Sequence, residues 1–304
     1  MSNLNAPHFQ DVDKAREYLE HLRWPNGPVC PHCRSVEAHY HLDGKAHRPG
    51  IYKCKDCREQ FTVTVGTVFE RSKIALNVWL QAVYLICSSK KGMSAKQLER
   101  MLGVTYKTAW FMAHRIREAM TSNSSGLLGG GGGTVEADET YWGTSQKKGH
   151  TALGYAHKMK VVSLVEREGK VRSFHVKDVK ASTIKEVLVS NVDKSANLMT
   201  DEASMYVKVG REFASHEAVR HGAGEYARGK AHTNTIEGCF SIFKRGMIGT
   251  YHKCGEQHLQ RYANEFDFRY NHRQKLGFDD IQRTKAALKG ISGKRQTYRR
   301  TNAQ

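Results

Sequence analysis

Three short segments of this chain each hold a carboxylate in strongly basic surroundings. Asp138 lies in VEADETYWG, Asp201 in LMTDEASMY and Glu237 in HTNTIEGCFSIFKRG. The whole chain has 48 Lys and Arg residues against 30 Asp and Glu residues, a formal net charge of +18. Because isolated carboxylates would repel the polyanion that such a charge attracts, we expect these three to bind metal cations. Metal-bound carboxylates in a protein that attracts nucleic acid indicate phosphodiester chemistry.

The oxygen ligands indicate which metal would bind. Carboxylates in a shallow, hydrated site suit Mg²⁺ or Mn²⁺, which keep several waters and bind through a few carboxylates and the substrate phosphate. Two such ions about 3.5–4 Å apart can activate the attacking oxygen and stabilise the leaving oxygen of an in-line displacement. Of the nearby acids, Glu136 shares the strand face of Asp138. Glu139 and Glu202 are expected to point away or to lie in the following loop.

A basic side chain follows the third acid at helical spacing. Lys244 lies seven residues beyond Glu237, which is two helical turns along the same face. A lysine there could reach a phosphate next to the ions, so we predict that Lys244 takes part in catalysis. Arg245 is its nearest competitor, and we predict that it contacts DNA.

Four of the seven cysteines have the spacing of a structural zinc site. Cys30-x-x-Cys33 is followed, after twenty residues, by Cys54-x-x-Cys57. Each pair lies in a tight turn, VCPHC or YKCKDC, so that both sulfurs of a pair can face one ion. We therefore predict a zinc ribbon whose folding is coupled to Zn²⁺ binding. Four buried thiols or an iron–sulfur site explain the two turns less simply, and His32 is an alternative ligand.

Length and composition limit the class of protein. The 304 residues suggest about two domains, and the sequence pI of 9.6 favours nucleic acid or another anionic surface as partner. No apolar run approaches the roughly 18 residues of a membrane span, and the opening MSNLNAPHFQDVDK lacks the regions of a signal peptide. We therefore expect a cytoplasmic protein without a membrane partner. The odd number of cysteines argues against a disulfide framework.

The N-terminal elements must position the zinc site. Apolar residues at helical spacing predict a helix over residues 11–22, before the ribbon. After the ribbon, the alternating sequence FTVTVGTVF at 61–69 predicts a strand or hairpin arm that completes the zinc module. The mostly apolar stretch at 77–89 predicts a core helix.

Residues 94–120 have the pattern of a helix-turn-helix, with Gly103 in the turn because the turn needs a residue that tolerates positive φ. The basic residues of the second helix are Lys107, His114, Arg115 and Arg117. Helix pairs with a glycine turn also occur in ordinary packing, but the basic context favours DNA contact. We predict that Lys107, Arg115 and Arg117 bind DNA.

The C-terminal half predicts the elements that carry the acids. Three strands come from TVEADETYWG, VVSLVERE and KVRSFHVK, then a helix from KASTIKEVLVSNV and a fourth strand from NLMTDE. This order is expected of a ribonuclease H-like sheet, in which the first and fourth strands lie side by side. Asp138 and Asp201 are then neighbours. The apolar stripe of the Glu237 helix would pack that helix against the sheet beneath them.

We therefore predict a multidomain α/β protein with a mixed sheet. Its predicted parts are an N-terminal helix and zinc ribbon (1–70), a helix-turn-helix DNA-binding region (71–120), a flexible Gly-rich linker (121–133), a ribonuclease H-like α/β catalytic domain (134–275) and a basic C-terminal tail (276–304). The linker carries five consecutive glycines, so DNA binding and chemistry would be separate modules.

The chain resembles the zinc-ribbon DDE transposases of bacterial insertion sequences, the IS-fifteen-ninety-five or ISXO-two-like group. The resemblance rests on RWPNGPVCPHC, YKCKDC, the helix-turn-helix and the three acidic segments, in consistent order over about residues 10–275. It implies that Asp138, Asp201 and Glu237 form the acidic triad and that Lys244 is the trailing basic residue. Some relatives carry Asn as the third member, so Asn234, one turn before Glu237, is the alternative third ligand.

The resemblance also implies an activity. It implies binding of terminal inverted repeats in double-stranded DNA, Mg-dependent nicking that frees a 3′-hydroxyl, and attack of that hydroxyl on target DNA. It further implies a homo-oligomer on DNA and a bacterial, nucleoid-associated location. Two alternatives are a non-catalytic zinc-ribbon regulator, which the intact triad argues against, and a nuclease that stops at hydrolysis, which the family-like N-terminal half argues against.

Overall fold

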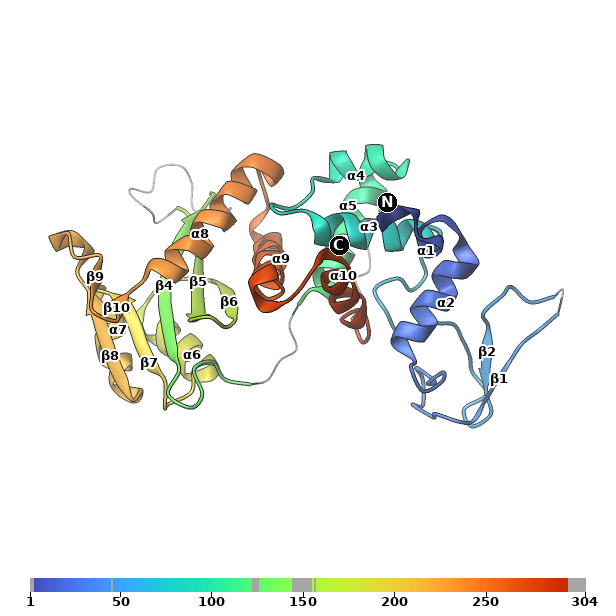
Figure 1. Cartoon of the computed structure of the whole chain (residues 1–304), viewed down its shortest axis with the longest axis horizontal. Coiled ribbons are helices and arrows are strands. Elements are labelled where there is room, and N and C mark those ends of the chain that lie inside the picture. The colour runs from blue at the N-terminus through green and yellow to red at the C-terminus, as the bar shows by residue number, and fades with distance from the viewer. Residues whose placement is uncertain (1–2, 45, 122–125, 144–154, 156, 295–304) are drawn as a thin grey trace, which may run out of the picture. The chain divides into compact units, whose positions relative to one another are not determined.

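The computed structural model describes residues 3–44, 46–121, 126–143, 155 and 157–294, and the chain divides into two compact units (Figure 1). Unit 1 contains the chain up to Thr121 together with the residues from Phe278 onward. Unit 2 contains the residues from Ser122 to Gly277. Among the described helices, none combines the length and the apolar character that a bilayer span requires.

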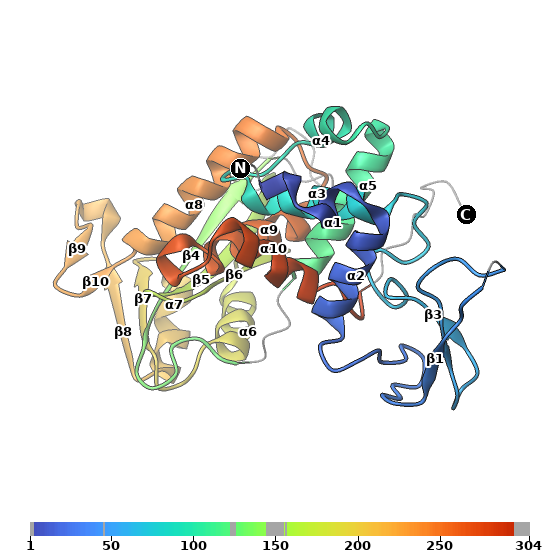
Figure 2. The ribbon, with the colours of Figure 1, turned by 45° about the vertical axis from the view of Figure 1, so that its right-hand side comes forward.

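A group of helices forms the core of unit 1. It consists of α1 (Pro7–Gln10), α2 (Val12–Arg23), α3 (Leu76–Ser88) and α10 (Asp280–Lys289), preceded by a short 3₁₀ turn, η1 (Asn3–Asn5). The apolar helix α3 packs against α1, α2 and α10, and Figure 2 shows these helices together. Leu19 of α2 and Trp79 of α3 are almost fully buried because the apolar faces of the helices pack together.

The predicted basic tail over 276–304 contains the helix α10. Asp279 and Gln282 form a capping box at its start, and Ala287 and Leu288 are buried. The cationic residues around these few apolar positions hide the helical pattern in the sequence. Residues 295–304, the rest of the predicted tail, lie outside the described part of the chain.

The ribbon of unit 1 is a small antiparallel sheet of β1 (His39–His41), β2 (Tyr52–Cys54) and β3 (Gln60–Phe61). The rings of Tyr52 and Phe61 stack at 5.6 Å, and the Trp24 ring packs edge-on against both. The strand predicted over 61–69 is wrong beyond Phe61, since the chain turns there. Arg23 Nη1 donates to the carbonyls of Val63 and Val65, at 2.6 and 2.9 Å, and so replaces the strand partners that these carbonyls lack.

Two further helices of unit 1 are joined by a tight turn. α4 (Ala95–Leu102) ends at Gly103, whose φ of +65° closes the turn, and α5 (Tyr106–Ala119) begins after Thr105. The Thr105 side chain caps α5 by accepting from the Thr108 N–H. Buried apolar residues on both helices hold the pair together.

Unit 2 is built on a five-stranded mixed sheet with the order β6-β5-β4-β7-β8. The strands are β4 (Thr134–Trp142), β5 (Met159–Glu166), β6 (Val171–Val176), β7 (Asn197–Asp201) and β8 (Ser215–Val219). β5 is antiparallel to β4 and β6, whereas β7 is parallel to β4 and β8. The first and fourth strands of this unit are therefore neighbours, as predicted.

Helices cover both faces of this sheet. α6 (Ala181–Asn191) and α7 (Ser204–Val209) share an apolar core with one face, and α8 (Asn234–Gly246) and α9 (Leu259–Asn271) pack on the other. The remaining short elements are the hairpin of β9 (Ala227–Arg228) and β10 (Ala231–His232), the 3₁₀ turns η2 (Gly210–Glu212), η3 (His221–Ala223), η5 (Glu256–His258) and η6 (Gln274–Leu276), and a π-helical turn, η4 (Met247–Tyr251).

Part of the predicted Gly-rich linker over 121–133 is anchored to unit 2, although most of its described residues are exposed. Leu128 is 3% exposed, and its N–H donates to the Asn191 carbonyl at 2.8 Å. The Gly129 N–H donates to Glu166 Oε1 at 3.0 Å. Glycines were expected to give a flexible chain, but these hydrogen bonds and the positive φ of Gly129 hold the middle of the segment against unit 2. Residues 122–125 lie outside the described part of the chain.

We expect the alanine variants of two glycines in this segment to differ in stability. A β-carbon at Gly129 would come within 2.6 Å of the Ala196 β-carbon, whereas one at Gly131 meets nothing within 4 Å. Their φ angles are similar, +76° and +71°, so the backbone strain is shared. Gly129→Ala should lower the free energy of unfolding by about 2–4 kcal/mol and Gly131→Ala by about 1 kcal/mol, measured by urea denaturation. Equal losses would show that the segment is not packed.

Candidate functional site

Two of the three predicted acids lie on adjacent strands. β4 and β7 pair in parallel with Glu136 opposite Met199, and two residues further along the same register Asp138 lies level with Asp201. Side chains at equal register on neighbouring strands point to the same face. Asp201 is the last residue of β7, so the pair lies where that strand ends. Both side chains are half-buried.

The third acid lies in the first turn of α8, the helix that packs on β4 and β5. Glu237 Oε1 accepts a hydrogen bond from Thr233 Oγ1 at 3.1 Å, and the side chain is 44% exposed. Asn234, the alternative third ligand, is exposed at the start of the same helix. The charge of Glu237 contributes to the raised pKa of Asp138, so this acid belongs electrostatically to the site.

A buried carboxylate holds the start of α8 in place. Glu136 is 0% exposed and accepts hydrogen bonds from Ile236 N and Thr235 Oγ1, each at 2.9 Å, and from Arg167 Nε at 2.7 Å. Arg167 also donates to the carbonyls of Lys230 and His232. The Glu136 oxygens therefore accept hydrogen bonds that position the start of α8, the helix of Glu237, and they are not ligands for an ion.

The site concentrates negative charge. Burial raises the pKa of Asp138 to about 8, and the charges of Glu139, Asp201 and Glu237 add to the rise. Burial also raises the pKa of Asp201, while the Ala203 N–H and the charge of His221 act against that rise. Divalent cations would relieve this repulsion, and oxygen donors that are half-buried to exposed suit Mg²⁺ or Mn²⁺.

The three acids form an open group rather than a closed cage. Among the described residues, only the cysteines of the ribbon form a group of three or more metal-binding side chains whose ligand atoms all lie within 4.8 Å of one another. Asp138, Asp201 and Glu237 are spaced more widely. Hydrated Mg²⁺ or Mn²⁺ ions keep waters among their ligands, so the wider spacing is compatible with such ions.

A histidine that the sequence analysis missed lies beside the acids. His221 Nε2 is 3.2 Å from Thr233 Oγ1 and 3.7 Å from Glu237 Oε1. Glu202, which was not expected to bind metal, accepts from the His221 and Gly222 N–H groups and so holds this turn. No ligand-like spacing marks His221, and the only sequence signal is its place between the last strand of the sheet and the helix of Glu237.

The other acid next to Asp138 faces the opposite side of the sheet. Glu139 Oε2 accepts a hydrogen bond from the Tyr206 hydroxyl of α7 at 2.9 Å. It therefore points away from the side of α8, as expected. Its charge still contributes to the raised pKa of Asp138.

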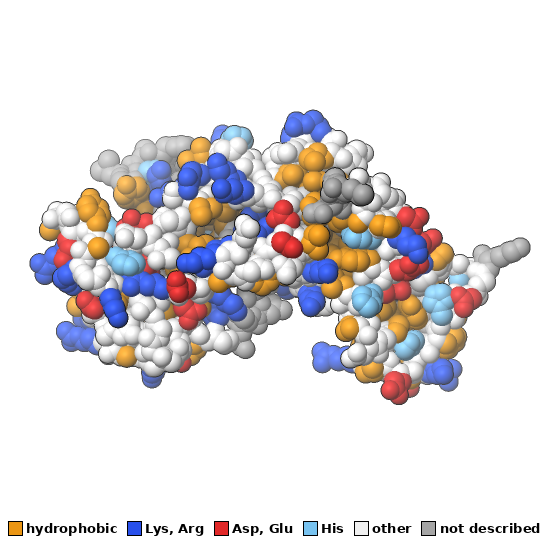
Figure 3. Space-filling view, viewed as in Figure 1, with side chains coloured by type: hydrophobic (Ala, Val, Ile, Leu, Met, Phe, Trp, Pro, Cys, Tyr) orange, Lys and Arg blue, Asp and Glu red, His pale blue; other side chains and the backbone are white. Residues whose placement is uncertain are grey.

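The predicted basic residues of α8 lie in its last turn. Lys244 and Arg245 are both exposed, and Arg245 Nε donates to the Ser241 carbonyl. Figure 3 shows Lys and Arg side chains gathered over this helix. Seven residues of helix rise about 10 Å, so Lys244 lies about two turns along α8 from Glu237.

The four predicted zinc ligands meet in the ribbon. Cys30 Sγ lies 3.7 Å from Cys57 Sγ, and Cys33 Sγ lies 3.6 Å from Cys54 Sγ. Tetrahedral Zn²⁺ with bonds of about 2.3 Å requires sulfurs about 3.8 Å apart, so the cluster fits this ion. The Cys57 N–H donates to the Cys54 sulfur and helps to lower the pKa of Cys54 to about 7. His32 is exposed and is not part of the cluster.

The structure corrects part of the predicted DNA-binding set on α5. Lys107 is exposed, but Arg115 is 7% and Arg117 is 2% exposed, and His114 is also buried. Arg115 Nη1 donates to the Glu70 carbonyl at 3.1 Å, and its guanidinium lies 4.8 Å from the centre of the Phe111 ring. Charge alone suggested exposure, but long basic side chains can bury their stems and bond to carbonyls.

Removal of zinc should unfold the ribbon. We expect the purified chain to hold about one Zn²⁺, and Cys54→Ser to lose it because three thiolates no longer close the site. Metal analysis gives the zinc content, and limited proteolysis over residues 24–61 reports the loss of structure. Cys254→Ser, outside the cluster, is the control and should keep both. Full zinc in Cys54→Ser would contradict the assignment.

The metal-free protein should lose stability as the pH rises through the Asp138 titration. A pKa raised from 3.8 to about 8 makes the folded state bind a proton that the unfolded state releases, so stability is full near pH 4 and falls towards pH 8. The loss is at most about 6 kcal/mol. In EDTA, Asp138→Asn should therefore be more stable than the wild type at pH 8.5 but not at pH 4.5. Thermal unfolding measures this, with Glu217→Gln on β8 as control.

Comparison with known proteins gives the family. Residues 130–271 match the ISXO2-like transposase domain, and residues 11–60 match the transposase zinc-ribbon domain. The chain is also 31% identical over 279 residues to an uncharacterised protein in the transposable element ISH50 of Halobacterium salinarum, covering 86% of this chain and 91% of that protein. The cysteine cluster lies in the matched zinc-ribbon region, and the three acids lie in the matched transposase domain. The chain therefore belongs to the zinc-ribbon, ISXO2-like family of insertion-sequence transposases.

Proposed function

We propose that this transposase binds the terminal inverted repeats of its insertion sequence and catalyses Mg-dependent DNA strand cleavage and strand transfer. The observation that carries the proposal is the placement of Asp138, Asp201 and Glu237 on β4, β7 and the first turn of α8, where burial and then the charges of the neighbouring acids raise the pKa of Asp138. Carboxylates that repel one another across neighbouring elements are stabilised by divalent cations, and such cations are what phosphodiester chemistry requires.

The sheet supports a ribonuclease H-like catalytic domain. Its order β6-β5-β4-β7-β8, with only β5 antiparallel to its neighbours, matches the arrangement proposed from the sequence. In unit 1, the pair α4 and α5 around Gly103 supports a helix-turn-helix, with Lys107 exposed near the start of the second helix. These two features support separate sites for chemistry and for DNA binding.

The residues of the site have distinct parts in the proposed reaction. Asp138 and Asp201, on the sheet, and Glu237, on α8, hold the ions. Glu136 and Arg167 fix the helix that carries Glu237. When bound, Mg²⁺ supplies the charge that activates the attacking oxygen and stabilises the leaving oxygen.

The same site serves two successive steps in this proposal. In the first step, water attacks a phosphodiester at the element end and leaves a 3′-hydroxyl. In the second step, that hydroxyl attacks a target phosphodiester, so one bond breaks as another forms. Lys244 contacts a phosphate beside the scissile one, which orients the strand for in-line attack. Since two ends must be joined to one target, we propose that the chain works as a homo-oligomer on DNA in the bacterial nucleoid.

Single amide substitutions test this proposal. Asp138→Asn, Asp201→Asn and Glu237→Gln should each lower cleavage and joining by at least about a hundredfold, since each removes a metal ligand. DNA binding should stay within about twofold, because the basic surface is unchanged. The assay follows nicked and joined products of a labelled duplex that carries the element's terminal repeat, with Mg²⁺.

The control and the contrary outcomes are defined in the same assay. Glu217→Gln, an exposed acid on β8, removes one negative charge from the same unit and should keep full activity. Wild-type activity in all three acid variants would refute the catalytic assignment. Cleavage without joined products would support a nuclease instead. If Asn234→Ala abolishes activity and Glu237→Gln does not, the third ligand is Asn234.

A further inference from the structure

A short segment of unit 1 separates two hollows that the proposed DNA-binding elements line. We call residues 71–74, between the ribbon and α3, the ridge. On one side, a pocket of about 340 Å³ is lined by ribbon residues including His32 and Arg48. On the other side, a groove of about 310 Å³ is lined by residues from the first half of α5, including Lys107. Arg71 lines both hollows, so the ridge joins the ribbon to the helix pair in one surface.

The groove combines cations with apolar side chains. Of the described residues that line it, four are basic, none is acidic, and five are large apolar or aromatic residues. Arg71, Lys73 and Lys107 are exposed at its rim. Arg115 forms part of its buried wall, held by the Glu70 carbonyl and the Phe111 ring. One buried and three exposed cations around the groove favour an anion along it.

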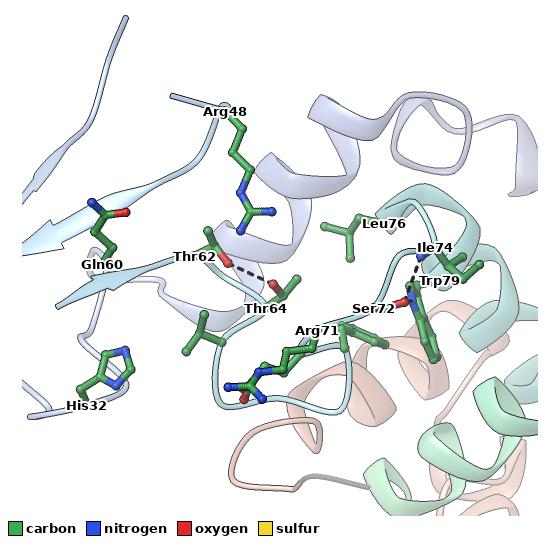
Figure 4. Close-up of a pocket in the computed structure, with 13 residues that line it drawn as sticks. His32, Arg48, Gln60, Thr62, Thr64, Arg71, Ser72, Ile74, Leu76 and Trp79 are labelled. Carbon is green, nitrogen blue, oxygen red and sulfur yellow. Dashed lines mark hydrogen bonds and ion pairs between the residues drawn. The ribbon is translucent and has the colours of Figure 1, made fainter. Parts of the chain in front are cut away.

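The ribbon pocket offers hydroxyls between two arginines. Figure 4 shows Arg48 and Arg71 on opposite sides of this pocket, with Thr62 and Thr64 between them. The two hydroxyls lie 3.0 Å apart and can each donate or accept. Glu70, the acid in this lining, accepts from the Gly66 N–H at 3.0 Å, so its charge is already bonded within the protein.

The backbone holds Arg71 in an uncommon conformation. Its φ is +55°, in the left-handed region that a non-glycine residue adopts at some cost, yet its side chain is 78% exposed. Arg71 Nε lies 3.7 Å from Glu70 Oε1, a contact between neighbouring residues that still leaves the arginine side chain exposed to solvent. Glycine would fit this backbone better, so a glycine variant can remove the charge without adding backbone strain.

We propose that the ridge binds the phosphate backbone of duplex DNA, with Arg71, Lys73 and Lys107 as the contacting side chains. This inference rests on the proposed function, because it places the DNA on unit 1. Cations and hydroxyls side by side suit phosphate oxygens. A strand on the ridge contacts the ribbon pocket through Arg71 and the α5 groove through Lys107, so the two elements bind one stretch of DNA in a fixed register.

A glycine variant tests the ridge without disturbing the fold. Arg71→Gly removes the charge and suits the φ of +55°, so the melting temperature should stay within about 3 °C of the wild type. Arg58→Gly is the matched control, because Arg58 is also exposed, has a φ of +63° and lines neither hollow. Binding of the full chain to a fluorescent 30-bp duplex of random sequence is measured by anisotropy, in zinc-containing buffer.

We expect Arg71→Gly to bind the duplex about threefold to tenfold more weakly and Arg58→Gly to bind as the wild type. The slope of log K against log salt should fall by about 0.9 for each phosphate that a variant no longer neutralises. The double variant Lys73→Ala/Lys107→Ala should therefore lower the slope by about 1.8, whereas Lys90→Ala/Lys91→Ala, an equal reduction of charge at exposed lysines outside the groove, should leave it unchanged.

The outcomes separate this inference from the proposed function. Equal weakening in the ridge variants and their controls would overturn the proposal that the ridge binds DNA. It would mean that the binding comes only from diffuse charge attraction. Unchanged binding in the ridge variants, with tight binding by the wild type, would overturn the ridge and keep DNA binding elsewhere on the chain. No binding by the wild type would overturn both.

Discussion

The buried ion pair of Glu136 and Arg167 is the interaction on which the acidic site depends. Glu136 is 0% exposed, and its two oxygens receive the backbone and side chain of the first turn of α8 as well as the guanidinium. Loss of either partner would leave a buried charge or an unmet helix N–H, at a cost of about 3–5 kcal/mol. The position of Glu237 relative to Asp138 thus follows from contacts of Glu136, two residues before Asp138.

The cysteine cluster and the proposed site for Mg²⁺ bring their ligands together in different ways. The thiolates of the ribbon are brought within 4.8 Å by two local turns, which suits a small tetrahedral ion that keeps no water. The carboxylates of unit 2 come from three separate elements and remain more widely spaced, which suits hydrated ions that must also bind substrate. Rigid backbone support matters more in the second case, because no short turn fixes the distances between its ligands.

How far the sequence predicts this molecule depends on the range of the interactions. The zinc ligands are predictable, because each pair is three residues apart. Asp138 and Asp201 are predictable through the order of the strands. His221 and the Glu136 contacts were not, since their partners lie far along the chain with no repeated spacing. The buried Arg115 and the packed glycines near Leu128 were misjudged because composition was taken to mean exposure or flexibility.

The charge pattern has a consequence for the order of binding in the proposed reaction. A chain of net charge +18 attracts DNA at long range, yet the ionised acids repel a phosphate at the last few ångströms. Burial, and after it the charges of Glu139, Asp201 and Glu237, raise the pKa of Asp138, so cations placed among these acids relieve their mutual repulsion. Cations reverse the sign of the site and supply the attraction that the scissile phosphate needs. Metal and DNA should therefore each strengthen the binding of the other at this site, as reciprocal linkage requires.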